Sequence, residues 1–135
     1  MRYLVDSDWI IDSLDGNETA VQLLARLALD RIGISIMSYA EVYQGAFYSR
    51  ESENDLQQLK RFLIGKRIVG LDVHIIERFS RIRGAMSPQI RRQVGDFDLL
   101  IAATAIERDL TLLSRNVRHF RFVPEVRLLE SIDAE

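Results

Sequence analysis

Short apolar runs alternate with longer amphipathic stretches along most of this chain. The apolar runs predict strands at residues 3–5, 34–37, 68–71, 111–114 and near 126–129. The amphipathic stretches, whose apolar residues recur at helical spacing, predict helices at residues 9–14, 18–30, 39–48, 53–64, 73–86 and 98–108. Strands that alternate with helices are typical of a parallel sheet with right-handed crossovers. The pattern therefore predicts an α/β fold, a three-layer α/β/α sandwich with a central parallel sheet of four to five strands.

Residues of special backbone character mark the ends of several predicted elements. Asn17 is expected to cap the second helix and Ser52 the fourth, because both side chains accept hydrogen bonds from free backbone N–H groups. Gly33 marks a break before the second strand. Pro88 is expected to stop the helix before it, since proline disfavours helical backbone in the preceding residue.

The composition is ordinary for a globular protein and excludes few functions. A chain of 135 residues fits one domain, residues 1–135, that can bury a substantial core. The absence of cysteine excludes disulfides and thiolate metal sites and is compatible with a reducing compartment. No apolar run approaches the roughly 18 residues of a membrane span, and no signal peptide precedes the first strand. We therefore expect a cytoplasmic protein with no membrane partner.

The net charge of −2 bears on one class of partner, nucleic acid. A protein that binds nucleic acid through bulk electrostatics usually has a basic balance, so this charge argues mildly against such a protein. A nuclease can compensate with local arginines and a metal ion. The charge therefore leaves nuclease activity open.

Three acidic residues, far apart in sequence, follow or adjoin the predicted strands. Asp6 ends the first strand, Glu41 lies in the helix after the second, and Asp98 starts the helix before the fourth. Ligands of open α/β sheets bind outside the carboxyl ends of the strands, so we expect these acids to meet in one site. Clustered carboxylates raise one another's pKa unless a cation joins them. Oxygen-only ligands suit Mg²⁺ or Mn²⁺.

Each acid also has a simpler, structural interpretation. Asp8 is a candidate cap of the first helix, and Ser38 with Glu41 matches a capping box, in which Glu41 reaches back to the backbone N–H of Ser38. Asp96 and Asp98 both lie in the first turn of an apolar helix, where the helix dipole favours negative charge. Asp96 is expected to be the cap, which leaves Asp98 to project toward the sheet edge.

Four motifs resemble those of PIN-domain ribonucleases. They are Asp6-Ser7-Asp8 after a strand, Glu41 in Ser-Tyr-Ala-Glu-Val-Tyr-Gln-Gly, Asp98 in Asp-Leu-Leu-Ile-Ala-Ala-Thr-Ala, and the closing Leu-Leu-Ser-Arg-Asn-Val-Arg-His-Phe. Length and motif order resemble the compact VapC-type toxins of type II toxin–antitoxin pairs in bacteria and archaea. The resemblance spans the chain from residue 3 to about residue 120.

The resemblance implies that Asp6, Glu41 and Asp98 are the catalytic acids and metal ligands of an endoribonuclease that uses Mg²⁺ or Mn²⁺. A metal-bound water of lowered pKa would attack an RNA phosphodiester bond. Asn116 falls where many members have Asp or Asn, and His119 falls where many have another acid. This departure leaves the role of His119, and the choice between one and two metal ions, open.

Other residues of these motifs are candidates for supporting roles. Polar side chains suited to orienting a ligand or water are Ser7, Asp8, Ser38, Asp96, Thr104 and Asn116. Arg115 and Arg118 are candidates for contact with RNA. The resemblance also implies a cognate antitoxin and a homodimer. The RNA target, the cleavage sequence and the identity of the antitoxin stay open.

A phosphatase is an alternative enzyme. The pair of Asp6 and Asp8 after a strand also resembles the nucleophile motif of haloacid-dehalogenase-like phosphatases. Against this alternative, the chain is short for a substrate cap and has only Lys60 and Lys66 to supply that family's cationic helper. Trp9 also replaces the small residue expected after the second acid.

A catalytically silent interaction module of the same fold is the alternative outside enzymes. Its acids would only cap helices. Tyr39, Tyr43 and Phe47 recur every four residues and therefore share one helix face. Such a row is more often part of a core, but if partly exposed it would suit a dimer contact or an antitoxin groove.

Overall fold

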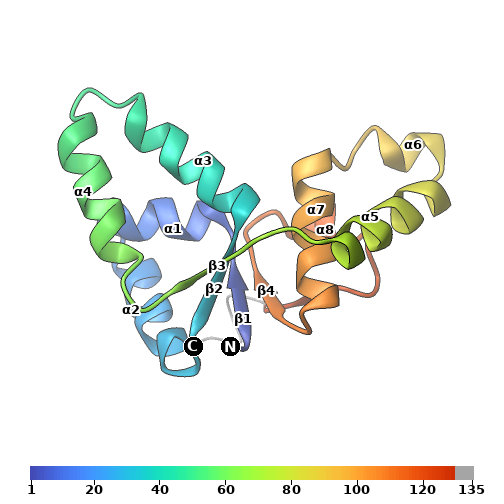
Figure 1. The fold of residues 1–135 in the computed structure, drawn as a ribbon, viewed down its shortest axis with the longest axis horizontal. Coiled ribbons are helices and arrows are strands. Elements are labelled where there is room, and N and C mark those ends of the chain that lie inside the picture. Colours follow the sequence, from blue (N-terminus) through green and yellow to red (C-terminus); the bar gives the residue numbers. More distant parts are fainter. Residues whose placement is uncertain (130–135) are drawn as a thin grey trace.

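The computed structural model describes residues 1–129, which are built around one parallel sheet (Figure 1). Its strands are β1 (Tyr3–Val5), β2 (Ile32–Ser35), β3 (Arg67–Val69), β4 (Thr111–Leu113) and β5 (Arg127–Leu128). They lie in the order β3-β2-β1-β4-β5, and all neighbouring pairs are parallel. The chain moves outward from β1 to β3 and then returns to the other side of β1. The carboxyl end of β1 is therefore the point where strand order reverses, where ligands bind in such sheets.

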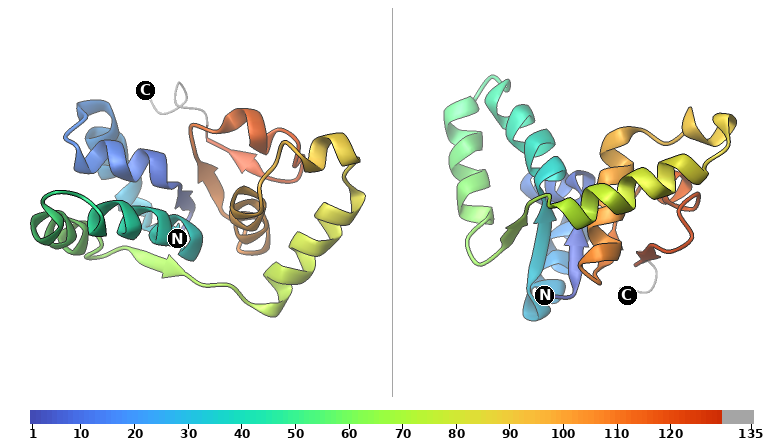
Figure 2. Two further views of the ribbon diagram at one scale, coloured as in Figure 1. Left: turned by 90° about the horizontal axis from the view of Figure 1, so that it is seen from above. Right: turned by 45° about the vertical axis from the view of Figure 1, so that its right-hand side comes forward.

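Helices cover both faces of this sheet (Figures 1 and 2). The helices are α1 (Ser7–Leu14), α2 (Glu18–Leu27), α3 (Ile36–Phe47), α4 (Ser52–Phe62), α5 (Val73–Ala85), α6 (Pro88–Arg91), α7 (Asp96–Glu107) and α8 (Val117–Phe120). A 3₁₀ turn, Ala28–Asp30, follows α2. Between residues 1 and 129, no helix combines the length and hydropathy needed to cross a membrane.

Two hydrophobic clusters explain the three layers. Side chains alternate between the two faces of a strand, so neighbouring residues of β1 and β4 enter different clusters. Val5 and Leu113 pack with α1 to α4 around Trp9. Leu4 and Leu112 pack instead with α7 and the segments around it. These contacts confirm the predicted α/β/α architecture and its parallel sheet.

The second strand is shifted from its predicted position, and the shift concerns Gly33. The strand runs over residues 32–35 and contains this glycine, which the sequence interpretation placed at a break. A Cβ on Gly33 would lie 2.7 Å from Met1 Sδ and 3.2 Å from Val69 Cγ2. Glycine therefore serves close packing in this strand, and the prediction of a break was wrong.

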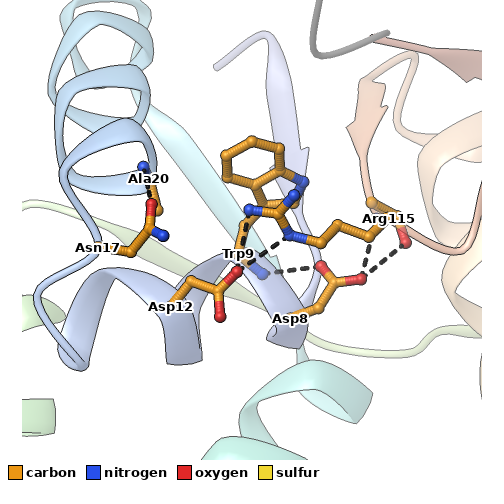
Figure 3. Close-up of polar contacts among 7 residues, drawn as sticks. Asp8, Trp9, Asp12, Asn17, Ala20 and Arg115 are labelled. Carbon is orange, nitrogen blue, oxygen red and sulfur yellow. Dashed lines mark hydrogen bonds and ion pairs between the residues drawn. The ribbon is translucent and has the colours of Figure 1, made fainter.

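Helix ends agree with the sequence in part. Asn17 caps α2 by accepting a hydrogen bond from the Ala20 N–H at 3.0 Å, as predicted (Figure 3). Ser52 was expected to cap α4, but it is the first residue of that helix, and the cap position makes no side-chain hydrogen bond. The helix before Pro88 ends at Ala85, yet this proline then opens the short α6.

Candidate active site

Asp6 anchors the site at the carboxyl end of β1. Its side chain is buried, 3% exposed, and accepts three hydrogen bonds. Oδ1 accepts from the Ser7 N–H at 2.8 Å and from Ser38 Oγ at 3.0 Å, and Oδ2 accepts from Ser114 Oγ at 2.7 Å. The first of these bonds makes Asp6 the cap of α1, whereas Asp8, the cap candidate from the sequence, lies inside the helix, so the prediction for Asp8 was wrong. The other two donors come from α3 and from the end of β4, and they fix this carboxylate between the two sides of the sheet.

Asp8 lies beside Asp6 in the first turn of α1. Its Oδ1 accepts from the Trp9 N–H at 2.7 Å, and its Oδ2 accepts from the Arg115 N–H at 2.9 Å (Figure 3). Burial, followed by the negative charge of Asp6, raises the pKa of Asp8 despite these two backbone hydrogen bonds. The carboxylate therefore links α1 to the segment after β4.

Glu41 faces the same region from α3. The capping-box interpretation was wrong, because β2 already ends at Ser35 and the Ser35 side chain caps the helix by accepting from the Ser38 N–H. Glu41 is thus in the second turn, and its Oε1 accepts a hydrogen bond from Ser7 Oγ at 3.2 Å. Burial raises the pKa of Glu41, and the charge of Asp6 raises it further, with smaller contributions from the other two acids, Asp98 and Asp8.

Asp98 enters from α7, on the other side of the sheet. Its Oδ2 lies 3.0 Å from His119 Nδ1. Asp96 was expected to cap this helix, but the cap position is Gly95, and Asp96 instead pairs with Arg83 at 2.8 Å. Because Asp96 is the first helical residue and not the cap, its side chain can turn away from the free N–H groups of the helix and toward Arg83. The same turn thus carries one acid in a surface ion pair and one acid near Glu41.

The closing motif contributes backbone contacts and one side chain that the sequence did not single out. Ser114 is buried, and its hydroxyl donates to Asp6 and accepts from the Asn116 N–H at 3.1 Å. Asn116 itself precedes α8 and makes no side-chain cap. The contact that connects Asn116 to the site is therefore made by its backbone N–H, whereas the Ser114 side chain contacts an acid directly. The signal available was its position directly after a buried strand.

Two candidate residues have other roles. The Thr104 hydroxyl donates to the Leu100 carbonyl at 2.7 Å within α7, so its expected role in orienting a ligand is not supported. The Arg115 side chain pairs with Asp12 at 2.9 Å, and its guanidinium lies 3.9 Å from the centre of the Trp9 ring (Figure 3). These contacts hold α1 against the end of β4. Arg115 thus has a structural role, and an RNA contact by Arg115 stays a prediction.

The acids fit a divalent cation by their chemistry, although they do not form a finished ligand cage. Within residues 1–129, no three acidic or histidine side chains stand at a spacing that would hold a metal ion. The expected convergence within coordination range is therefore not met. Three elements nevertheless supply oxygen donors, from Asp6, Glu41 and Asp98. The negative charges of Asp6 and Asp98 both raise the pKa of Glu41. Such a set of repelling carboxylates suits Mg²⁺ or Mn²⁺.

Comparisons with known proteins agree with this geometry. The PIN domain family matches residues 3–125. Ribonuclease VapC19 of Mycobacterium tuberculosis is 36% identical over 129 residues, which cover 92% of this chain and 96% of that protein. The structure of VapBC2 from Rickettsia felis bound to a DNA fragment has a TM-score of 0.83 and 24% identity, over 96% of this chain and 98% of that chain. A toxin–antitoxin complex from Klebsiella pneumoniae has a TM-score of 0.72 and 26% identity, over 96% and 97% of the two chains.

The parallel sheet and the acids around the end of β1 are thus accompanied by similarity over almost the whole chain. This chain belongs to the PIN-domain family and is a VapC-like member of it. The match confirms the resemblance found in the sequence. It gives no support to the phosphatase alternative.

Proposed function

We propose that this protein is an endoribonuclease that requires Mg²⁺ or Mn²⁺ and acts as the toxin of a toxin–antitoxin pair. The observation that carries the proposal is the buried Asp6 at the carboxyl end of β1, with Glu41 linked to it through Ser7 and Asp98 close enough for its charge to raise the pKa of Glu41. The ribonuclease name of the relative at 36% identity supports RNA as the substrate. The toxin–antitoxin complex of similar fold supports a cognate antitoxin as the partner.

The acids have different parts in this proposal. Ser38 and Ser114 hold the Asp6 carboxylate in one orientation, which makes it the fixed member of the set. Glu41 and Asp98 would complete the binding of the ion from opposite sides of the sheet. When bound, the ion supplies charge stabilisation at the phosphate and a water of lowered pKa.

Asp8 and His119 act at one remove. Asp8 accepts a hydrogen bond from the Arg115 N–H and thereby fixes the segment after β4. That segment includes Ser114, which donates to Asp6. His119 holds the Asp98 carboxylate through its Nδ1. Each of these contacts orients an acid that would hold the ion, a role that typically changes metal affinity or activity by about 10- to 100-fold when removed.

Asp98→Asn tests the chemistry, with Asp96→Asn as its matched control in the same helical turn. The amide keeps the shape of Asp98 but removes a charge that holds the ion, so cleavage of a labelled RNA in Mg²⁺ or Mn²⁺ should fall at least about 100-fold. Asp96→Asn, whose acid pairs with Arg83 on the surface, should stay within about threefold of the parent. Equal activity of Asp98→Asn and the parent would contradict the assignment, and calorimetric titration with Mn²⁺ gives a second readout.

Asp6→Asn tests the same chemistry less cleanly than Asp98→Asn does. Asp6 accepts from three donors, and an asparagine would turn an NH₂ group toward at least one of them. We expect this variant to lose activity and also about 1–3 kcal/mol of stability. Thermal unfolding should therefore accompany any activity measured for it.

The toxin role needs a test in cells. Induced expression of the parent should arrest growth, co-expression of the cognate antitoxin should relieve the arrest, and Asp98→Asn should be harmless. Unaffected growth together with no RNA cleavage would favour the silent interaction module. A homodimer and a cytoplasmic location stay predictions, and the RNA target stays open.

A further inference from the structure

Positive charge is concentrated in the second half of the chain. Residues 73–129 hold ten arginines and six acidic residues, whereas residues 1–72 hold eight basic and eleven acidic residues. The small net charge of the whole chain therefore conceals two parts of opposite sign. A local basic surface can bind nucleic acid even where the total charge cannot.

Four of the six acids of this half pair with an arginine, and a fifth, Asp98, contacts His119. The arginine pairs are Asp96–Arg83, Asp109–Arg127, Glu107–Arg78 and Glu125–Arg78. Within the described part of the chain, five exposed arginines of the same half have no acidic partner. They are Arg81, Arg91, Arg92, Arg118 and Arg121. Their charge is available to a ligand.

Contacts connect part of this arginine set to the side of the site that carries Asp98. Arg83 contacts Asp96 at the start of α7 and donates to the Arg91 carbonyl at 3.4 Å, so the end of α5, α6 and the start of α7 are tied together. Figure 2 shows α6 beside the end of α5. Arg118 precedes His119, the residue that holds Asp98. Two of the five arginines are thus connected to the helical turn that carries Asp98, Arg91 through Arg83 and Arg118 through its neighbour His119.

A hollow beside the arginines adds an apolar surface. It has a volume of about 480 Å³ and lies between α5, α6 and the segment after α8. Arg81 lies on its lining together with Ile82, Ile90 and Phe122. Single-stranded RNA is bound by this combination, with phosphates on cations and unstacked bases on aromatic or apolar side chains.

We propose that Arg81, Arg91, Arg92, Arg118 and Arg121, named here the arginine surface, hold the phosphate backbone of single-stranded RNA beside the acidic site. An unstacked base of that strand would enter the hollow along α5. The inference rests on the proposed nuclease function, because continuity with the acids favours RNA over an acidic protein segment. Arginine suits the task because its planar guanidinium binds phosphate oxygens in pairs.

The test compares two triple variants that lose the same charge. One is Arg91→Gln/Arg92→Gln/Arg118→Gln, and the control is Arg26→Gln/Arg50→Gln/Arg61→Gln, which alters exposed arginines of the first half. Binding of a fluorescein-labelled RNA of mixed sequence, about 20 nucleotides long, is followed by anisotropy in EDTA at about 50–200 mM KCl. The first triple should reduce the slope of log affinity against log salt by about 2, since each phosphate contact on a single strand contributes about 0.7. The control should change the slope by less than about 0.5.

The outcomes separate this inference from the nuclease proposal, because binding in EDTA needs no cleavage. Equal slope changes in both triples would overturn the arginine surface, since only total charge would then matter. Unchanged RNA binding combined with lost binding of a polyglutamate peptide would overturn it in favour of an acidic protein. If the parent cleaves RNA while the first triple binds as the parent does, the surface fails and the nuclease stands. If the slope falls in a protein that never cleaves RNA, the surface stands and the nuclease fails.

Discussion

The helices on the two sides of the sheet carry the acids of the site on very different surfaces. On one side, α3 bears Glu41 together with Tyr39, Tyr43 and Phe47, and with Tyr48 just after the helix these rings form an aromatic row. Successive ring centres in this row lie 5.2–6.4 Å apart. On the other side, α7 bears Asp98 beside the arginine surface. The same sheet thus places one acid next to apolar rings and another next to unpaired cations.

Exposure decides what the aromatic row can do. Tyr43 is 43% exposed and Phe47 is 54% exposed, and the row lines a shallow groove of about 460 Å³. The shared face predicted from sequence spacing is confirmed, and the row lies largely outside the core. Apolar rings favour a protein partner, whereas the cations favour RNA. The two sides of the site thus offer different chemistry, with apolar contacts beside Glu41 and electrostatic contacts beside Asp98.

Salt should separate the two surfaces most strongly. If all five residues of the arginine surface contact phosphates, RNA affinity should fall about 100-fold between about 50 and 200 mM KCl. Self-association through the aromatic row, measured by sedimentation, should change less than about threefold over the same range, because apolar contacts involve no counterion release. RNA affinity that ignores salt would break the comparison.

Ser114→Ala tests the hydrogen bond to Asp6, the acid that lies between the two sides of the sheet. The variant leaves Asp6 Oδ2 without its 2.7 Å donor in a buried site, so the free energy of unfolding should fall by about 1–3 kcal/mol. Ser80→Ala is the control, since that exposed hydroxyl donates only to the Ile76 carbonyl and should change stability by less than about 0.5 kcal/mol. Urea unfolding measures both. Equal losses of unfolding free energy in the two variants would mean that the hydrogen bond from Ser114 to Asp6 stabilises the fold no more than a surface hydrogen bond does.

Arg115 and Arg118 should behave differently although they are three residues apart. Arg115→Gln removes the contacts with Asp12 and the Trp9 ring and should lower stability by about 1 kcal/mol with an unchanged salt slope for RNA. Arg118→Gln should reduce that slope by about 0.7 and leave stability within about 0.5 kcal/mol. The reverse assignment of effects would place the RNA contact at Arg115.

Glu41→Gln should have the smallest effect on stability, and the size of that effect depends on pH. Because the pKa of Glu41 is raised in the folded protein, the stability tied to its protonated form is complete at low pH and is lost as pH rises through the raised pKa. In EDTA, the variant should therefore melt slightly above the parent at pH 7. The gain should vanish toward about pH 4, near the ordinary pKa of a glutamate. A gain that is equal at both pH values would contradict this electrostatic origin.

Periodicity carried most of the fold prediction. The long helices and the five strands were found because their apolar positions repeat over enough residues to set a period. The helices α6 and α8 span four residues each, too few for any period, and they were missed. The second strand was misplaced because Gly33 acts through packing against Met1 and Val69, which local pattern does not contain.

The acidic residues of the site could be predicted from their positions near strand ends, but the hydrogen-bond partners of the hydroxyl groups could be found only from the structure. Thr104 and Ser114 look alike in sequence, yet one donates to its own helix and the other to Asp6. Which partner such a hydroxyl finds depends on where β2, β4 and α7 begin and end, to within one residue. The role of Glu41 depended on the same detail, because β2 ends at Ser35 and α3 therefore begins too early for Glu41 to belong to a capping box.

The placement of β1 between β2 and β4 has a consequence for protein synthesis. Asp6 is synthesised before its donor Ser114, which follows 108 residues later. At about 5–20 residues per second, the ribosome needs roughly 5–20 s to cover that interval. A nascent chain that stops before Thr111 holds all three acids of the site but lacks the strand and the hydroxyl that bury and orient the first of them. The order of translation thus delays the complete acidic site until β4 and Ser114 have been synthesised.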